Sequence, residues 1–247
     1  NMGWHYRRLV VPRILPQCRK IITVSHFERN RIREALRLPD GQITTVYNGY
    51  SRHFYPQEDP SPITRKYIEE SRYLFFLGNT DPKKNVPRTL KAYSLYREKS
   101  PKPLPLLIAD IKEEILGSIL REQGIEHVRP HIVCPGYIPN TDLPYLYSGA
   151  FAFLYTSLRE SFGIPLLEAM ACGTPVVTSN TSSMPEVGGP GALLCDPTDA
   201  KDIAHKILSL EKDPALYRQQ IQYGLRRAKR FSWETTATEL LSIYKSI

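Results

Sequence analysis

Short apolar runs alternate with segments of helical periodicity over most of the chain, and this alternation limits the possible folds more than any other feature. Val86, Leu90 and Tyr93 mark one face of a predicted helix, and residues 113–123 and 143–147 are predicted to form two more. Strands that alternate with helices predict an α/β fold, a Rossmann-like parallel sheet with helices on both faces. The apolar runs that predict its strands are residues 73–77, 104–109, 132–133, 150–155, 175–178 and 192–195.

The first fifty residues show the same pattern on a smaller scale. Residues 21–25 and 43–46 are predicted strands, and Ser25 is a suitable N-cap for a helix over residues 26–36. Residues 51–71, rich in proline and charge at their start, predict a linker. Three helices are expected after the last strand, and their N-caps are Asp199, Asp213 and Ser232.

Two carboxylates surround the start of a helix directly after the apolar run 150–155. Glu160 lies in the loop, and Glu168 lies about one turn into the helix. Pro165 suits the first helical position, where its missing N–H costs nothing, and Gly163 allows the backbone to approach a ligand closely. Free N–H groups at a helix start attract anions. An α/β fold presents chemistry in this way, at the carboxyl end of its sheet.

A second loop has the composition of a phosphate site. Gly78 follows a predicted strand, and Lys83 and Lys84 precede the next helix. A glycine has no side chain to block a diphosphate from approaching the backbone, and a lysine balances the charge of the diphosphate. An exposed turn with solvated lysines is the alternative interpretation.

The overall charge predicts anionic partners. Lys and Arg exceed Asp and Glu by 33 to 25, a net charge of +8. One basic cluster, near Trp4 and Tyr6, comprises Arg7, Arg8, Arg13, Arg19 and Lys20, and a second comprises Arg226, Arg227, Lys229 and Arg230. Both are interpreted either as solvated helix faces or as contacts with anionic lipid.

Cysteine spacing and hydropathy indicate the compartment. Cys18, Cys134, Cys172 and Cys195 are scattered without a C-x-x-C pair, which argues against a disulfide framework or zinc site and for a reducing cytoplasm. Each is expected to be a small buried apolar residue. The sequence shows neither an 18-residue apolar run nor a secretory signal.

The stretch from Glu160 to Glu168, followed by Cys-Gly-Thr-Pro-Val-Val at 172–177, closely resembles the E-x7-E signature of retaining GT-B glycosyltransferases, specifically glycosyltransferase family 4. The resemblance implies two Rossmann-like domains that face a cleft. It assigns residues 1–50 to the remnant of an N-terminal acceptor domain with the hinge, and 51–71 to the linker. Residues 72–231 become the GT-B C-terminal, donor-binding domain, and 232–247 a helix that returns across the hinge. The chain is therefore expected to be a donor-binding part, inactive alone.

The same resemblance implies roles for the loop residues. Glu160 would be the catalytic carboxylate that faces the donor sugar, and Glu168 would bind the ribose hydroxyls. Lys84 matches the family's phosphate-binding lysine, whereas Asn79 occupies the position of its usual arginine, for which Lys83 is the alternative. The remaining donor-binding residues are expected to be Gly78, Tyr137, Ile138, Ser161, Phe162, Gly163 and Ile164.

Three further points are left open. Tyr137 either borders the nucleobase or lies in the core. Residues 181–186, rich in serine, are expected to cap a helix rather than bind donor. Neither a metal nor a cofactor is expected, because Lys84 and the helix dipole would neutralise the leaving diphosphate.

The resemblance also implies reaction partners and a cellular location. The reaction would transfer a sugar from a UDP- or GDP-linked donor to a lipid-linked or saccharide acceptor with retention, in bacterial surface polysaccharide synthesis. The protein would be cytoplasmic, on the inner face of the plasma membrane, and would not bind nucleic acid. The alternatives are a GT-B epimerase or phosphorylase, and a basic nucleic-acid-binding module; RNP, KH and zinc-finger patterns are missing.

Overall fold

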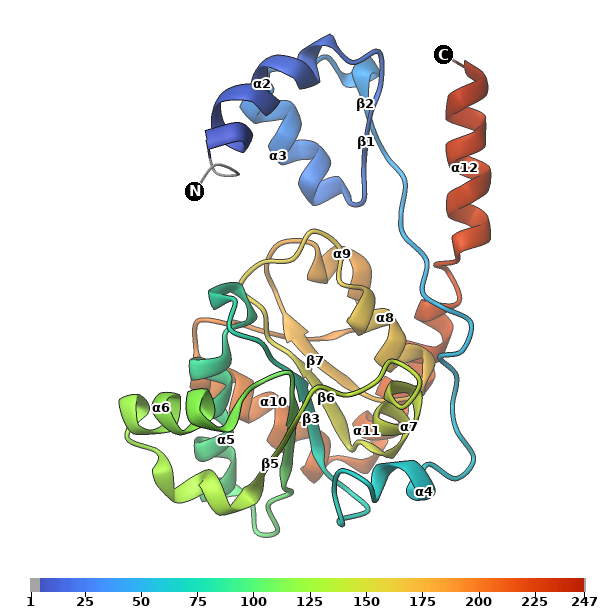
Figure 1. Cartoon of the computed structure of the whole chain (residues 1–247). Coiled ribbons are helices and arrows are strands. Elements are labelled where there is room, and N and C mark those ends of the chain that lie inside the picture. Colours follow the sequence, from blue (N-terminus) through green and yellow to red (C-terminus); the bar gives the residue numbers. More distant parts are fainter. Residues whose placement is uncertain (1–4, 247) are drawn as a thin grey trace.

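The computed structural model describes residues 5–246, which form two lobes joined by two chain segments (Figure 1). The side chain of Arg7, which was assigned to the first basic cluster, and nearby Trp4 lie outside the described part, as does residue 247. The larger lobe contains a six-stranded sheet, and the smaller lobe contains a two-stranded sheet.

The large sheet is parallel throughout, as the sequence predicts. Its strand order is β5-β4-β3-β6-β7-β8, and Leu74 of β3 pairs with Leu106 on one side and Ala152 on the other. The chain winds outward from β3 in one direction and from β6 in the other, so these two strands form the topological switch point. The strands are β3 (Leu74–Leu77), β4 (Leu106–Ala109), β5 (Ile132–Gly136), β6 (Ala152–Tyr155), β7 (Val176–Ser179) and β8 (Leu193–Cys195).

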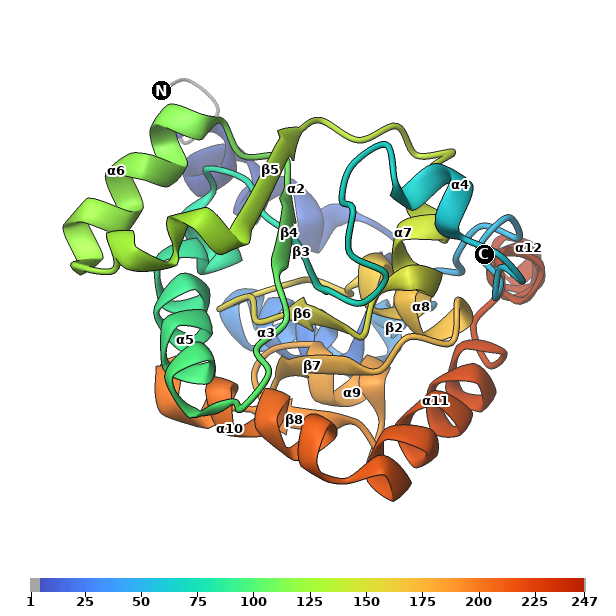
Figure 2. The same ribbon diagram turned by 90° about the horizontal axis from the view of Figure 1, so that it is seen from below.

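Helices cover both faces of this sheet (Figure 2). Successive strand residues point to opposite faces, so Leu74 and Phe76 pack under α5, α6 and α10, whereas Phe75 packs on the side of α7 and α8. The helices and helical turns of this lobe are α4 (Ser61–Thr64), η4 (Pro82–Lys84), α5 (Val86–Lys99), α6 (Glu113–Gln123), η5 (Glu126–His131), α7 (Leu143–Gly149), α8 (Ile164–Ala171), α9 (Met184–Gly188), α10 (Ala200–Lys212) and α11 (Pro214–Ala228).

The smaller lobe is built around a parallel pair of strands. Ile21 and Ile43 face each other in this pair and, with Leu38, form a small core. Ser25 caps α3 as predicted, since its hydroxyl accepts a hydrogen bond from the Glu28 N–H at 3.2 Å. The elements are η1 (Tyr6–Val10), α2 (Val11–Ile14), η2 (Leu15–Gln17), β1 (Ile21–Thr23), α3 (His26–Leu36), η3 (Asp40–Gln42) and β2 (Ile43–Thr45).

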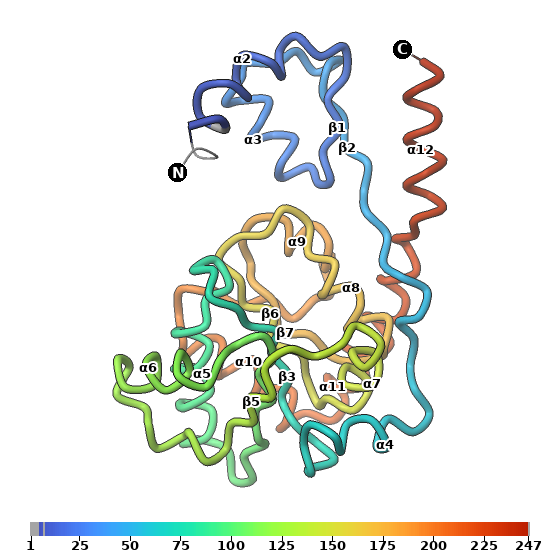
Figure 3. Tube along the Cα trace, viewed as in Figure 1, coloured from blue at the N-terminus to red at the C-terminus, as the bar shows by residue number. Residues whose placement is uncertain are grey.

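The chain passes between the lobes twice, and the two passages lie side by side (Figure 3). Tyr50 and Ser232 form a parallel bridge, and the Thr236 hydroxyl donates to the Tyr47 carbonyl at 2.6 Å. A Cβ atom at Gly49 would collide with the Ser232 and Trp233 backbone, so glycine permits the close approach. The second passage leads into α12 (Trp233–Ser246), which runs beside the small lobe.

Three local expectations need correction. The segment predicted as linker contains the short helix α4, which packs against α7. Buried Tyr73 lies one residue before β3 instead of opening it, although its carbonyl already accepts a hydrogen bond from the Phe151 N–H at 2.8 Å. Cys18 and Cys134 are only half-buried, whereas Cys172 and Cys195 are buried as expected.

Candidate functional site

The loops after β3 and β6 meet at the carboxyl edge of the sheet, at the switch point where α/β folds bind ligands. The Lys84 ammonium and the Glu160 carboxylate form an ion pair, with Nζ 2.7 Å from Oε1. Their side chains are only 17% and 11% exposed. The structure therefore brings together the two residues to which the sequence assigns phosphate binding and catalysis.

Lys84 is held in place by the turn that carries it. Asp81 caps the turn η4 by accepting a hydrogen bond from the Lys83 N–H, and the Lys83 carbonyl accepts one from the Leu158 N–H at 2.7 Å. Buried Asn85, in the left-handed region at φ 61°, donates to the carbonyls of Thr156 and Pro197. Asn85 thus fastens this loop to the Glu160 loop, a role that its sequence position did not indicate.

Gly78, Asn79 and Lys83 lie near Lys84 but differ in what they offer. A Cβ at Gly78 would lie 2.8 Å from the Ile111 Cδ1 atom, so a larger residue there requires the Ile111 side chain to move. The Asn79 Oδ1 accepts a hydrogen bond from the Asp81 N–H at 2.9 Å, which stabilises the turn. The Lys83 ammonium is half-exposed and lies 3.5 Å from the Asp81 carboxylate.

Glu160 is surrounded by donors. In addition to Lys84, the Ser157 hydroxyl donates to its Oε1 at 2.9 Å. Its backbone N–H donates to the Ser182 hydroxyl at 3.1 Å, and the buried Ser183 hydroxyl donates to its carbonyl at 3.0 Å. Ser182 adopts a φ of 52°, a strained conformation of the kind found at functional sites.

Residues 181–186 were expected to cap a helix, and this expectation is wrong for the serines. Ser183, the residue before α9, makes no side-chain capping bond there; its hydroxyl donates to the carbonyls of Glu160 and Phe162. Glu186 instead accepts hydrogen bonds from the N–H groups of His26 and Phe27 at the start of α3. These partners are over twenty positions away, so local sequence gave no signal for them.

The helix α8 begins at Ile164, one residue before the predicted start, so Pro165 occupies its second position instead of the first. Gly163 precedes the helix with a φ of 104°, a conformation that side chains disfavour, and Pro165 lies in the first turn. The Phe162 ring is buried against Tyr47 and Phe231, so this residue can offer a ligand only its backbone. Ile164 is partly buried, packed against the core on the α8 side of the sheet, and exposed Ser161 contacts the small lobe.

Glu168, in the second turn of α8, is partly buried. Burial raises the pKa of its carboxyl to about 7, although the hydrogen bond from the Tyr147 hydroxyl, 3.3 Å from Oε2, lowers it. An electron-rich oxygen beside a helix start suits a ligand hydroxyl group.

The loop after β5 separates its two predicted binding residues. Tyr137 is 77% exposed, which excludes the core interpretation, whereas Ile138 is 4% exposed and packs in the core. Gly136, at φ 79°, turns the chain between them and the strand. Only Tyr137 therefore presents its side chain to solvent.

The second basic cluster is partly structural. The Arg227 guanidinium donates to the carbonyls of Val187 and Glu186 at 2.8 and 2.6 Å, and burial lowers the pKa of Arg227. Arg226, Lys229 and Arg230 are exposed. In the first cluster, Lys20 donates to the Gly41 carbonyl at 2.7 Å.

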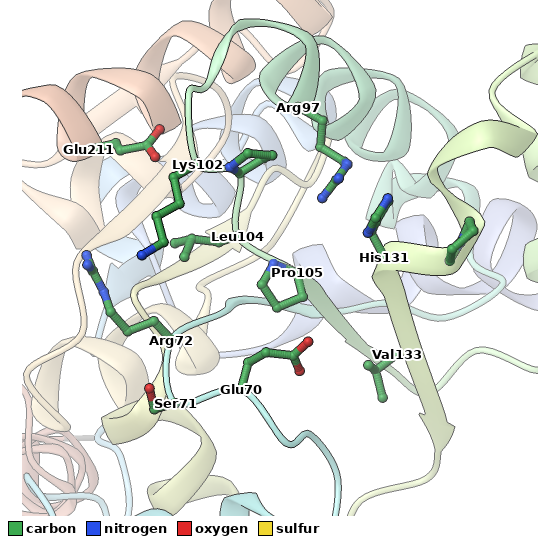
Figure 4. A pocket seen from close by; sticks show the side chains of 12 residues that line it. Glu70, Ser71, Arg72, Arg97, Lys102, Leu104, Pro105, His131, Val133 and Glu211 are labelled. Atoms are coloured by element: carbon green, nitrogen blue, oxygen red, sulfur yellow. The ribbon is translucent and has the colours of Figure 1, made fainter.

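A large pocket of about 700 Å³ lies at the opposite, amino edge of the sheet (Figure 4). Arg72, Arg97 and Lys102 line it together with Glu70 and Glu211, so its charges are mixed. Because α/β folds bind ligands at the carboxyl edge of the sheet, near the switch point, we assign the candidate site to the edge that holds Lys84 and Glu160 and not to this pocket.

The described residues contain no cluster of His, Cys, Asp and Glu that could hold a metal ion. No helix in the range 5–246 is long and apolar enough to cross a membrane.

Comparison with known proteins identifies the family of the chain. The family model described as "Glycosyl transferases group 1" matches residues 63–227. The chain is 34% identical over 241 residues to the O-antigen chain mannosyltransferase B of Escherichia coli, and the match covers 94% of this chain and 61% of that protein.

Solved structures share the fold. A sucrose-phosphate synthase from Thermosynechococcus elongatus superposes with a TM-score of 0.82 at 25% identity, over 98% of this chain and 61% of that one. HepE from Anabaena, solved with UDP and glucose, gives a TM-score of 0.79 at 18% identity, over 93% and 64% of the two chains. The chain thus spans about three fifths of the length of these proteins and has the GT-B fold.

Proposed function

The chain belongs to the glycosyl transferases group 1 family, and from this premise we propose that it binds a nucleoside-diphosphate sugar whose glycosyl group is transferred to an acceptor hydroxyl. The observation that carries the proposal is the buried pair of Lys84 and Glu160 at the switch point of the sheet. A cation and a carboxylate at this edge supply the two charges that a leaving diphosphate and an electron-poor sugar require.

In this proposal Lys84 and the first turn of α8 receive the diphosphate. Gly163 leaves the N–H groups at the helix start accessible, and their dipole adds to the Lys84 charge. A diphosphate bound here competes with Glu160 for the Lys84 ammonium. Donor binding therefore releases Glu160 toward the sugar at the moment the phosphate is neutralised.

Glu168 and Tyr137 then act on the nucleoside. Glu168 accepts hydrogen bonds from the ribose hydroxyls, and exposed Tyr137 borders the base. Glu160 faces the sugar and stabilises positive charge on its anomeric carbon, with the configuration retained as in glycosyltransferase family 4. Lys84 and the α8 dipole carry the charge neutralisation in this scheme.

We further propose mannose as the sugar and a bacterial surface polysaccharide as the product. The support is the resemblance to the O-antigen chain mannosyltransferase. The acceptor is then a saccharide or a lipid-linked saccharide, and the exposed arginines and lysine at the end of α11 favour an anionic membrane surface.

Calorimetry and thermal shift test donor binding directly. GDP-mannose, UDP-glucose, GDP and UDP are titrated into the chain, and a donor at roughly 100 times its Kd adds about 2.7 kcal/mol to the free energy of unfolding.

Lys84→Ala should weaken diphosphate binding about tenfold or more, the loss expected for one charge-assisted hydrogen bond. Lys83→Ala removes the same charge one position away and serves as the matched control. Equal affinities of the parent and Lys84→Ala for every diphosphate would refute the assignment.

A further inference from the structure

Both sequence neighbours of Glu160 are bound to one side chain of the small lobe. The Glu28 Oε1 accepts a hydrogen bond from Arg159 Nη2 at 2.8 Å and from the Ser161 hydroxyl at 3.0 Å. The Ser25 hydroxyl donates to the Ser161 carbonyl at 2.7 Å. Glu28 and Ser25 belong to the first turn of α3 and its cap, more than 130 positions before the loop.

The segment that leads into α9 holds the same loop. The Ser182 and Ser183 hydroxyls bind the N–H and the carbonyl of Glu160. Glu186 of α9 accepts from the N–H groups of His26 and Phe27 at 2.7 and 3.1 Å. A carboxylate is favoured at a helix N-terminus, so α3 and α9 are attached to each other as well as to the loop.

The burial of these groups indicates that their alignment is fixed. The Glu28 side chain is 12% exposed, and Ser25 and Ser183 are fully buried. A buried carboxylate needs its partners, and Glu28 has two from a single tripeptide. Movement of the small lobe away from the loop would break both bonds together.

We propose that Glu28 is a positioning residue, which orients the Glu160 carboxylate toward the donor sugar only while α3 is seated against residues 159–161. The assignment of Glu160 to the sugar rests on the proposed function. The geometry needed is tight, since a displacement of about 1 Å in a reacting group can cost roughly 100-fold in rate. Glu28 thus makes the arrangement of the candidate site depend on closure of the two lobes.

The test compares donor affinities with and without the sugar. The quantity measured is the ratio of the Kd for a nucleoside diphosphate to the Kd for its sugar-linked form, obtained by calorimetry on the whole 247-residue chain. Glu28→Gln should reduce this ratio about tenfold while leaving the Kd for the nucleoside diphosphate within about twofold. Glu34→Gln makes the same charge change at an exposed position of α3 and should change neither value.

A charge swap separates positioning from mere support. Glu28→Arg alone places two arginines together and should lose the sugar preference, whereas Glu28→Arg combined with Arg159→Glu restores an ion pair and should recover part of it. The single variant Arg159→Glu is measured as well. The proposal would be overturned if the double variant showed a Kd ratio no higher than that of the worse of the two single variants. So would a Glu28→Gln variant that keeps the parent ratio.

Amide hydrogen exchange tests the same coupling without any ligand. Exchange at residues 158–163 should be about tenfold faster in Glu28→Gln than in Glu34→Gln or the parent. If the parent binds none of the nucleotides, the proposed function fails, and unchanged exchange would then also overturn the coupling. If the parent binds donor but Glu28→Gln keeps both its ratio and its exchange, the function stands and only the inference about Glu28 is rejected.

Discussion

Glu160 and Glu168 are eight positions apart, yet their surroundings give them different chemistry. Glu160 forms an ion pair with Lys84 and accepts a second hydrogen bond from the Ser157 hydroxyl. Glu168 accepts a hydrogen bond from the neutral Tyr147 hydroxyl, and burial raises its pKa to about 7. Glu160 is therefore paired with a cation, whereas Glu168 changes its protonation near neutral pH.

The raised pKa of Glu168 has a consequence for stability. In the unfolded chain this carboxyl ionises near 4.5, whereas in the folded chain it keeps its proton until about pH 7. Its contribution is fully present below pH 4.5, and we expect it to be lost between these two values with a slope of at most about 1.4 kcal/mol per pH unit. Urea unfolding of the parent and Glu168→Gln across this interval measures the difference, and parallel curves would contradict the expectation.

The two glutamates should also separate in binding experiments. Glu168→Ala removes the acceptor for the ribose and should weaken nucleoside-diphosphate binding about tenfold. Glu160→Gln removes the carboxylate that competes for Lys84, so the affinity for the same diphosphate should stay equal or increase, while the preference for the sugar-linked form is lost. Calorimetry on both variants measures these affinities. If Glu160→Gln bound the diphosphate more weakly than Glu168→Ala, the roles assigned to the two glutamates would have to be exchanged.

At the scale of single elements, the entry into α8 depends on one glycine. Gly163 has a φ of 104°, and a Cβ there would lie 3.2 Å from the Tyr155 ring. Gly163→Ala should therefore lower the free energy of unfolding by about 1–3 kcal/mol, the usual cost of such strain. Gly41→Ala, where no atom lies within 4 Å of the added Cβ, is the control in the same denaturation assay. If both variants lost a similar amount of unfolding free energy, the turn at residue 163 would have relaxed to accommodate the alanine.

Elements governed by local chemistry could be predicted from the sequence, and those governed by distant partners could not. The helix over residues 26–36 begins at the predicted Ser25 cap, and the parallel sheet follows from apolar runs that alternate with helical segments. The pairing of Lys84 with Glu160 was missed because it joins residues 76 positions apart. Ser183 and Glu186 were misread for the same reason, since their partners lie on other segments of the chain.

At the scale of the whole molecule, the contact at Gly49 sets how the lobes are joined. A methyl group at this position would collide with the backbone of Ser232 and Trp233. We expect Gly49→Ala to separate the two passages and open the lobes, with a larger radius of gyration in small-angle scattering and a changed emission from half-exposed Trp233. A variant with the parent's scattering curve would show that the passages can shift without opening.

The paired passages also restrict the kind of motion that the molecule can undergo. Tyr50 and Ser232 are bridged, and Thr236 is bonded to Tyr47, so the two connections form one short ribbon instead of two separate tethers. Two connections bonded to each other restrict the small lobe more than one free tether would, because each limits how far the other can swing. The first turn of α3 therefore meets residues 159–161 from a narrower range of directions than a singly tethered lobe would.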